Sequence, residues 1–172
     1  MDADGSARIV EGARELAAQA AALGLNLRGI FHATSSGGTQ AGLVAGIGIF
    51  GGERTRVTGI SVEDPAKEAA QTVREVLGGV NELLGLSREF ASAEVEVDER
   101  FIGAGYAIPS PAADAATDLL ARMEGVVLDP VYTAKAMAGF LQWAASGSFT
   151  PEDDILFWHT GGQLALFQEA LP

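Results

Sequence analysis

Residues 27–42 have the sequence LRGIFHATSSGGTQAG. The run up to Thr34 is short and largely apolar, which is typical of a strand buried on both faces of a parallel sheet. A turn rich in serine and glycine follows, and small residues then continue as an expected helix over about residues 39–48. A strand, a glycine-rich turn and a helix in this order predict one unit of an alternating α/β fold.

The rest of the chain repeats this alternation of strands and helices. Further strands are expected at residues 56–62, 95–97, 126–128 and 155–159, and further helices at 7–23, 65–84, 111–125 and 133–146, with a short helix at the C-terminus. Strands separated by crossover helices imply a mainly parallel sheet with helices on both faces. The length of 172 residues suits one domain, which we expect to span residues 1–172.

Turn and capping residues predict several helix boundaries. Gly24 is expected to end the first helix, because glycine readily adopts the left-handed backbone found after helix C-termini. Asp64 and Pro65 have the residue types of an N-cap and a first helical residue. Ser110 and Pro111 are expected to open another helix in the same way.

Composition argues against several classes of function. The chain has 23 acidic and 11 basic residues, a formal charge of −12, so nucleic acid is not an expected partner. Cysteine is absent and histidine occurs only as His32 and His159, which argues against disulfides, thiolate nucleophiles and a metal site. No run of about 18 apolar residues is free of charges or glycines, so a membrane span is not expected. Residues 1–4 are acidic, unlike a signal peptide, and we expect a cytoplasmic protein.

The turn at residues 33–42 is the first segment that could carry chemistry. It joins the end of a strand to a helix N-terminus, where N–H groups have no intrahelical partner and the helix dipole is positive. Gly37 and Gly38 let an anion approach the backbone closely. Ser36 and Thr39 add hydroxyl donors, so the turn suits a phosphate group. The alternative is a tight turn whose glycines serve packing only.

Three later segments combine glycines with aromatic or hydroxyl side chains. They are GAGYAIP at residues 103–109, LDPVYTAKAMAG at 128–139 and FWHTGG at 157–162. Loops that follow parallel strands meet at one edge of a sheet, where open α/β folds bind ligands. We therefore expect the loops at 34–39, 129–133 and 159–162 to line one crevice.

Each of these segments also has a purely structural interpretation. Tyr106 alone would be a half-buried packing residue. Asp129 and Thr133 would be turn and cap residues, and Lys135 an ion-pair or surface residue.

Together, the four motifs resemble the family of D-cysteine desulfhydrase and 1-aminocyclopropane-1-carboxylate (ACC) deaminase, which has the tryptophan-synthase-β-like fold. The resemblance extends over about residues 25–170 and implies pyridoxal phosphate as the cofactor. The cofactor-binding residues that it implies are Ser36, Gly37, Gly38, Thr39 and Thr160. The first four would hold the cofactor phosphate, and the last would face the pyridine nitrogen.

The resemblance also implies two catalytic tyrosines and a branch of the family. Tyr132 would pack against the cofactor ring, and Tyr106 would lie near the substrate, a small amino acid. ACC deaminases typically have a glutamate and a leucine where this chain has Thr133 and Thr160. A hydroxyl at the pyridine nitrogen does not force its protonation, so the ring is a weaker electron sink. The chain is therefore more similar to D-cysteine desulfhydrases, which implies a lyase that performs α,β-elimination.

The family resemblance also implies a missing part. Family members have an N-terminal half with the lysine that binds the cofactor, whereas this chain contains only Lys67 and Lys135, and neither matches that lysine. We expect the chain alone to be inactive. The first hypothesis is a split enzyme, a hetero-oligomer with a lysine-bearing polypeptide, or failing that a homo-oligomer. A truncated fragment of an ordinary lyase and a non-catalytic binding or scaffold domain are the alternatives.

Overall fold

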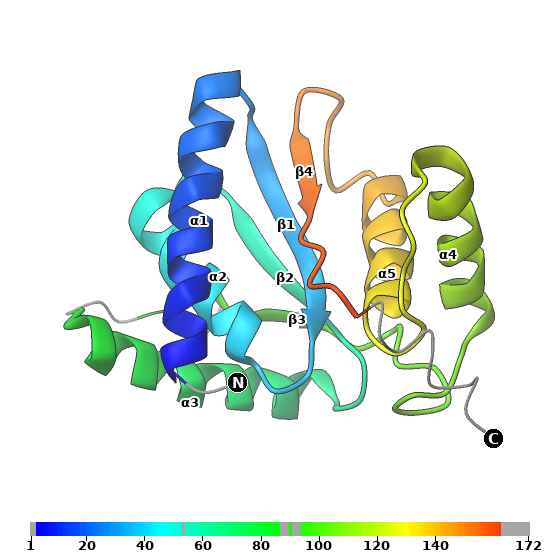
Figure 1. The fold of residues 1–172 in the computed structure, drawn as a ribbon, viewed down its shortest axis with the longest axis horizontal. Helices are drawn as coiled ribbons and strands as arrows, with labels where there is room; N and C mark the ends of the chain where they lie inside the picture. Colours follow the sequence, from blue (N-terminus) through cyan, green and yellow to red (C-terminus); the bar gives the residue numbers. More distant parts are fainter. Residues whose placement is uncertain (1–2, 53, 87–89, 91–93, 163–172) are drawn as a thin grey trace.

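Four parallel strands form the sheet at the centre of the structure (Figure 1). The structure is a computed structural model that describes residues 3–52, 54–86, 90 and 94–162. The strands are β1 (Leu27–Thr34), β2 (Arg56–Ser61), β3 (Glu96–Asp98) and β4 (Asp154–Phe157), in the order β3-β2-β1-β4. All three strand pairs are parallel, so the predicted α/β fold with a mainly parallel sheet is confirmed.

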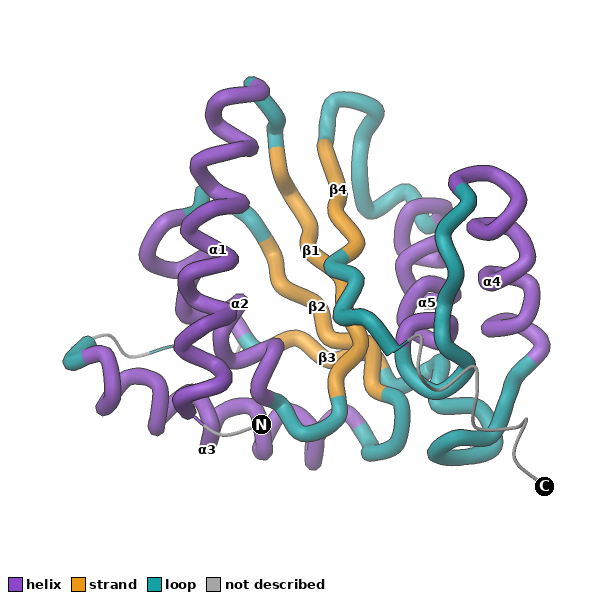
Figure 2. Tube along the Cα trace, in the orientation of Figure 1, coloured by secondary structure: helices purple, strands orange, loops and turns teal. Residues whose placement is uncertain are grey.

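The helices of the described residues cover both faces of this sheet (Figure 2). They are α1 (Ala3–Leu23), α2 (Gly38–Phe50), α3 (Ala66–Leu84), α4 (Pro111–Glu124) and α5 (Thr133–Ala145). Helices α1, α2 and α3 pack on one another over one face, while α5 packs against β1 and β2 on the other, with α4 outside it. Helices on both faces were predicted, and this is confirmed. Within the described ranges, no helix has the length and apolar character needed to cross a membrane.

Strand β1 is buried on both faces because its side chains alternate between two apolar clusters. Ile30 belongs to the cluster beneath α1, α2 and α3. Phe31 points to the opposite face, where its ring lies 5.6 Å from that of Phe140 and 5.8 Å from that of Trp143, both on α5. This burial on both faces is the reason for the short apolar run in the sequence.

Helices α1 and α2 approach each other closely at two glycines of α2. A Cβ atom at Gly42 would lie 2.5 Å from the Cβ of Ile9, and one at Gly46 would lie 2.4 Å from the Cβ of Ala13. Only glycine therefore fits at these points. The close packing holds α2, and with it the glycine-rich turn that precedes it, in a fixed position.

Most of the predicted helix boundaries agree with the structure. Gly24 ends α1 with a left-handed φ of 68°. Ser110 caps α4, because its hydroxyl accepts a hydrogen bond from the N–H of Ala113 at 3.3 Å. The prediction that Asp64 is the N-cap of α3 is wrong by one residue: Pro65 is the N-cap, since its carbonyl accepts the first helical hydrogen bonds.

Residues 126–128 do not form the predicted strand. Leu128 is buried, but it packs in an apolar cluster with α4 and α5 instead of joining the sheet. Val126 and Val127 are exposed, and the sheet order β3-β2-β1-β4 leaves this segment without a neighbouring strand among the described residues. An extended segment with no partner for its backbone groups cannot form a ladder. The short C-terminal helix predicted from the sequence lies outside the described residues.

Candidate functional site

A cavity of about 290 Å³ lies at the carboxyl edge of the sheet, where β1 leads into α2. Its lining comes from three segments that are far apart in the sequence: residues 33–39, Tyr132 and Thr160. This lining includes every residue that the sequence predicts to bind the cofactor, and one of the two predicted catalytic tyrosines. The predicted convergence of these loops is confirmed, while the binding roles of the residues stay predictions.

The turn before α2 is shaped for the close approach of a ligand to the backbone. Gly37 is the N-cap of α2 with a φ of 77°, and no side chain caps the helix. This left-handed conformation favours glycine, and a Cβ here would lie 3.1 Å from the backbone of Val73 on α3. Because the first N–H groups of a helix lack intrahelical acceptors, α2 directs donors and the positive end of its dipole at the cavity.

Thr34 provides a second, independent indication of a ligand. Thr34 is only 3% exposed and is one of the residues that line the cavity, and its Oγ1 has no hydrogen-bond partner in the described part of the chain. A buried hydroxyl without a partner costs about 1–3 kcal/mol, a cost that a polar group in the cavity would remove. The lining contains hydroxyls and backbone N–H groups but no carboxylate, and this donor set fits a phosphate.

The two predicted catalytic tyrosines contact each other at this cavity. The hydroxyls of Tyr106 and Tyr132 are hydrogen-bonded, and the rings meet edge to face with centroids 5.9 Å apart. The bond to Tyr106, followed by burial and the negative charges of Glu63 and Asp129, raises the pKa of Tyr132 to about 12. Tyr132 therefore keeps its proton at neutral pH. Tyr106 is 47% exposed, and its ring packs against that of Tyr132, which also agrees with a half-buried packing residue.

Asp129 organises the start of α5. Its buried carboxylate accepts hydrogen bonds from the N–H groups of Val131, Tyr132 and Thr133, at 2.7 to 3.0 Å, and from the Thr133 hydroxyl at 2.6 Å. A Cβ at Gly162 would lie 2.4 Å from this carboxylate, so the loop that carries Thr160 packs directly on it. The sequence suggested a turn residue here. The bonds to residues 131–133 agree with that turn role, and Tyr132, not Asp129, is the N-cap of α5.

Glu63 is a residue of the site that the sequence analysis missed. The hydroxyl of Ser35, which lines the cavity, donates a hydrogen bond to its carboxylate. Glu63 lies two residues after the end of β2, at the same edge of the sheet as the cavity, and that position is the signal that could have identified it. Among the described residues, no three histidine, aspartate or glutamate side chains are grouped as a metal ion would require.

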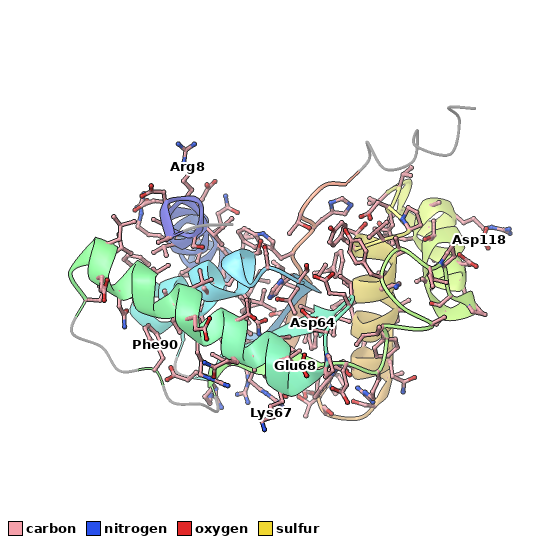
Figure 3. All side chains as sticks on the ribbon, turned by 90° about the horizontal axis from the view of Figure 1, so that it is seen from below. Arg8, Asp64, Lys67, Glu68, Phe90 and Asp118 are labelled. Carbon is pink, nitrogen blue, oxygen red and sulfur yellow. The ribbon has the colours of Figure 1, made fainter. Side chains whose placement is uncertain are left out.

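The two lysines lie away from the cavity lining. Lys67 is exposed and points outward from α3 (Figure 3). Lys135 is fully buried, which corrects the expectation of a surface or ion-pair residue. Its Nζ donates hydrogen bonds to the carbonyl oxygens of Ile102 and Gly105, both at 2.7 Å, and burial lowers the pKa of its ammonium group.

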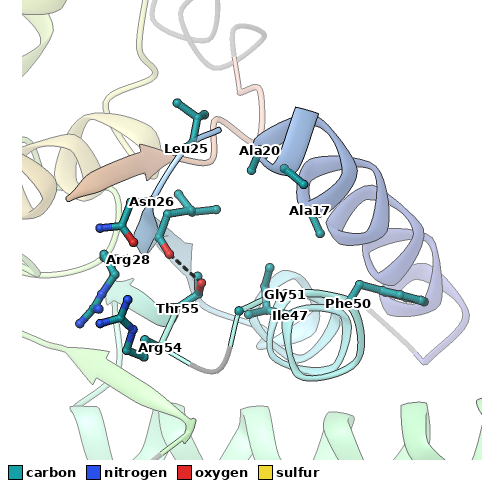
Figure 4. Close-up of a pocket in the computed structure, with 13 residues that line it drawn as sticks. Ala17, Ala20, Leu25, Asn26, Arg28, Ile47, Phe50, Gly51, Arg54 and Thr55 are labelled. Carbon is teal, nitrogen blue, oxygen red and sulfur yellow. Dashed lines mark hydrogen bonds between the residues drawn. The ribbon is translucent and has the colours of Figure 1, made fainter. Parts of the chain in front are cut away.

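A larger hollow of about 520 Å³ lies at the opposite end of β1 (Figure 4). Residues of α1 such as Ala17 and Ala20 form one side, and the Thr55 hydroxyl donates to the Leu27 carbonyl at 2.7 Å across from them. It contains none of the predicted site residues. It also lies at the amino ends of the strands, whereas open α/β sheets bind ligands at the carboxyl ends.

The chain is similar to known proteins over most of its length. A family model described as pyridoxal-phosphate dependent enzyme matches residues 2–161. Proteins named 1-aminocyclopropane-1-carboxylate deaminase, from Burkholderia cenocepacia and Burkholderia multivorans, are each 34% identical to it over 154 residues, or 90% of this chain and 45% of theirs. A crystal structure of an ACC deaminase homologue matches with a TM-score of 0.79 and 30% identity, over 91% of this chain and 45% of that one. The chain thus spans about half the length of the curated relatives it matches.

Proposed function

Because the chain belongs to the family of pyridoxal-phosphate dependent enzymes, we propose that it forms the cofactor-holding half of a lyase. The reaction would be an α,β-elimination on a small amino acid with a leaving group on its β-carbon, as in D-cysteine desulfhydrases. The cavity lined by residues 33–39, Tyr132 and Thr160 carries this proposal. These are the positions where the family resemblance expects the phosphate, the ring and the pyridine nitrogen.

The residues around the cavity fit pyridoxal phosphate. Backbone N–H groups at the start of α2 and the hydroxyl of Thr34 would hold the phosphate. Tyr132 would pack against the ring, and Thr160 would form a hydrogen bond with the pyridine nitrogen. When bound, the cofactor supplies an electron sink for negative charge at the substrate Cα. A threonine there leaves this sink weaker than a carboxylate would, which favours substrates with a good leaving group.

The elimination needs one base and one leaving group. The base takes the Cα proton, the electrons of the Cα–H bond form a double bond to Cβ, and the sulfur leaves with the electrons of the Cβ–S bond. The aminoacrylate product then reacts with water to give pyruvate and ammonia. Tyr132 is protonated at neutral pH, so it would hold the ring and not act as the base, while Tyr106 would position the substrate.

The base would be a lysine on a partner polypeptide. Lys67 points outward from α3, both Lys135 hydrogen bonds go to backbone carbonyls, and neither residue lines the cavity. The family resemblance expects such a lysine in an N-terminal half. We therefore propose a hetero-oligomer in which a second polypeptide provides that half.

Binding can be tested by equilibrium dialysis with pyridoxine phosphate, which lacks the aldehyde and does not attach to lysines. Thr34→Val removes only the unpartnered hydroxyl, so affinity should fall about tenfold or more, since a hydrogen bond to a charged group is worth about 1.5–3 kcal/mol. The unfolding free energy of the ligand-free protein should stay equal or rise, because a buried unsatisfied group is removed. Gly38→Val should abolish binding.

Thr117→Val on α4 is the matched control and should leave affinity unchanged, because this residue lies outside the cavity lining. Wild-type affinity in both Thr34→Val and Gly38→Val would place the phosphate elsewhere. No binding by the wild-type chain, alone or with its partner, would instead favour a scaffold domain.

The reaction itself can be tested by product analysis on the chain alone and on the pair. Pyruvate from D-cysteine, formed only by the pair and lost in Tyr132→Ala, is the expected result. Formation of 2-oxobutanoate from ACC would place the chain with the deaminases instead. Pyruvate formation by the chain alone, surviving Lys67→Ala and Lys135→Ala, would contradict the lysine mechanism.

A further inference from the structure

The buried ammonium group of Lys135 has only backbone partners among the described residues. The side chain is 0% exposed, and its Nζ donates to the carbonyl oxygens of Ile102 and Gly105 at 2.7 Å each. A buried charge is tolerated only when hydrogen bonds compensate for the lost water. The two carbonyls are therefore the reason why this lysine is accepted inside the fold, and the lysine in turn holds their loop.

The loop that accepts these bonds contains one residue in an unfavourable backbone conformation. Gly103 and Gly105 have φ values of 72° and 146°, and Ala107 has a φ of 57° although it carries a Cβ. Among the described residues, Ala107 is the one non-glycine residue with positive φ. Such conformations persist only where surrounding contacts hold them. The bonds from Lys135 are contacts of this kind, and Gly105, which accepts one of them, lies two residues before Ala107.

Tyr106 directly precedes Ala107 in this loop. Its hydroxyl bonds to that of Tyr132, which lies three residues before Lys135 at the start of the same helix. We propose that Lys135 is a positioning residue, which fixes residues 102–107 so that the Tyr106 hydroxyl meets Tyr132 beside the cavity. Lys135 does not line the cavity and two of its three protons are engaged, so it acts through the loop and not on the substrate.

The absorbance of ionised tyrosine tests this inference without any cofactor. The chain contains only two tyrosines, Tyr106 and Tyr132, so the signal comes from this pair alone. The bond to Tyr106 is the largest cause that raises the pKa of Tyr132 to about 12. Lys135→Met should free the loop and return the pKa of Tyr132 toward its ordinary value of about 10. Its ionised fraction at pH 11 should then rise from about one tenth to about nine tenths.

The absorbance is read directly after a jump to pH 11, before alkaline unfolding, and Tyr132→Phe identifies the contribution of Tyr132. Lys67→Met is the matched control, because it makes the same change at the exposed and only other lysine. It should leave the tyrosine signal unchanged. Amide hydrogen exchange at neutral pH should speed up at residues 103–108 in Lys135→Met but not in α1.

A chemical rescue separates positioning from general stability. The chain has no cysteine, so Lys135→Cys can be alkylated in denaturant at that one site and refolded. An aminoethyl group rebuilds the ammonium, while a propyl group has the same length without charge or donors. The aminoethyl form should restore the wild-type tyrosine signal, and the propyl form should not.

Two results would overturn the inference. One is a folded Lys135→Met or propyl protein with the wild-type tyrosine signal. The other is a propyl form that does not fold when the aminoethyl form does, because Lys135 would then support the whole fold and not this loop. The inference rests on the proposed function only where it assigns a role to the tyrosine pair. A failure of cofactor binding would leave the tyrosine results unaffected, so the two can fail separately.

Discussion

His32 is a buried histidine in the middle of β1. Its Nδ1 lies 2.8 Å from the carbonyl oxygen of Ala33, so Nδ1 carries the proton, and Nε2 has no partner among the described residues. Burial lowers the pKa of His32 from its ordinary 6.5 to about 4. The imidazole is therefore neutral in the folded protein at neutral pH. Acid favours the unfolded chain, where the same side chain takes up a proton more easily.

The free energy of unfolding should consequently depend on pH through His32. It should be highest above about pH 6.5 and fall by up to about 3 kcal/mol as the pH drops to about 4, where the folded form also takes up the proton. Urea unfolding of the wild type and of His32→Asn, whose amide can still bond to the Ala33 carbonyl, measures this. Subtracting the two pH profiles removes the contribution of the carboxylates. Parallel profiles between pH 6.5 and 4 would contradict the role of His32.

At the scale of residues, the sequence alone identified those residues of the candidate site that belong to a short local pattern. Gly37 and Gly38 beside hydroxyl residues at a strand end are visible in one short stretch, and so is Thr160 before its glycine pair. Glu63 and Lys135 were missed or misjudged because their partners are distant: Ser35 lies 28 residues from Glu63, and Ile102 lies 33 from Lys135. No local pattern contains such a contact.

Among the helices, the close packing of α1 against α2 depends on glycine residues at their contact. Gly46→Ala would place a Cβ 2.4 Å from the Cβ of Ala13, so the helices must separate. We expect a loss of about 1–3 kcal/mol in the free energy of unfolding. Gly78→Ala on α3 is the matched control, because its Cβ would meet nothing within 4 Å.

The control should raise the free energy of unfolding by about 0.5–1 kcal/mol, since alanine favours helix more than glycine does. Chemical denaturation of both variants measures whether the two substitutions change the free energy of unfolding in opposite directions. An equal effect of the two substitutions would show that helix propensity, and not the contact with α1, controls the stability at Gly46.

The element that the sequence mispredicted is the strand at residues 126–128. Its apolar residues are typical of a buried strand, but a strand also requires a neighbour, and a sequence pattern does not show whether one is present. A sequence pattern also does not show how much of α5 is covered by its neighbours, and the first seven residues of this helix are all buried. The helix lies between the sheet and α4, so a lysine within it is enclosed where an amphipathic helix would expose it.

For the whole molecule, the exposed pair Val126 and Val127 is where we expect the proposed partner to bind. Val126 and Val127 are exposed and without a neighbouring strand among the described residues, and exposed apolar segments of this kind mark interfaces. Val127→Glu should weaken association with the lysine-bearing polypeptide at least tenfold, because a charge would be buried at the contact.

Leu23→Glu is the control for this prediction, since Leu23 is also apolar and even more exposed but lies at the C-terminal end of α1 (Figure 1). Light scattering of the mixed polypeptides measures the assembly. A complex that forms equally well with both variants would remove residues 126–128 from the interface. A well-folded monomer of 17.7 kDa that binds no partner would contradict the assembly altogether.

The order β3-β2-β1-β4 places the last strand of the described chain directly beside the first. Asn26, just before β1, also donates to the Asp154 carboxylate and the Glu152 carbonyl, more than 120 residues away. Contacts between such distant segments form slowly. On the ribosome, the turn around Gly37 is therefore made long before Thr160 emerges, and the cavity remains open on one side until β4 docks. Completion of the cavity is a late event in synthesis, so during most of translation the nascent protein has the glycine-rich turn but no finished pocket.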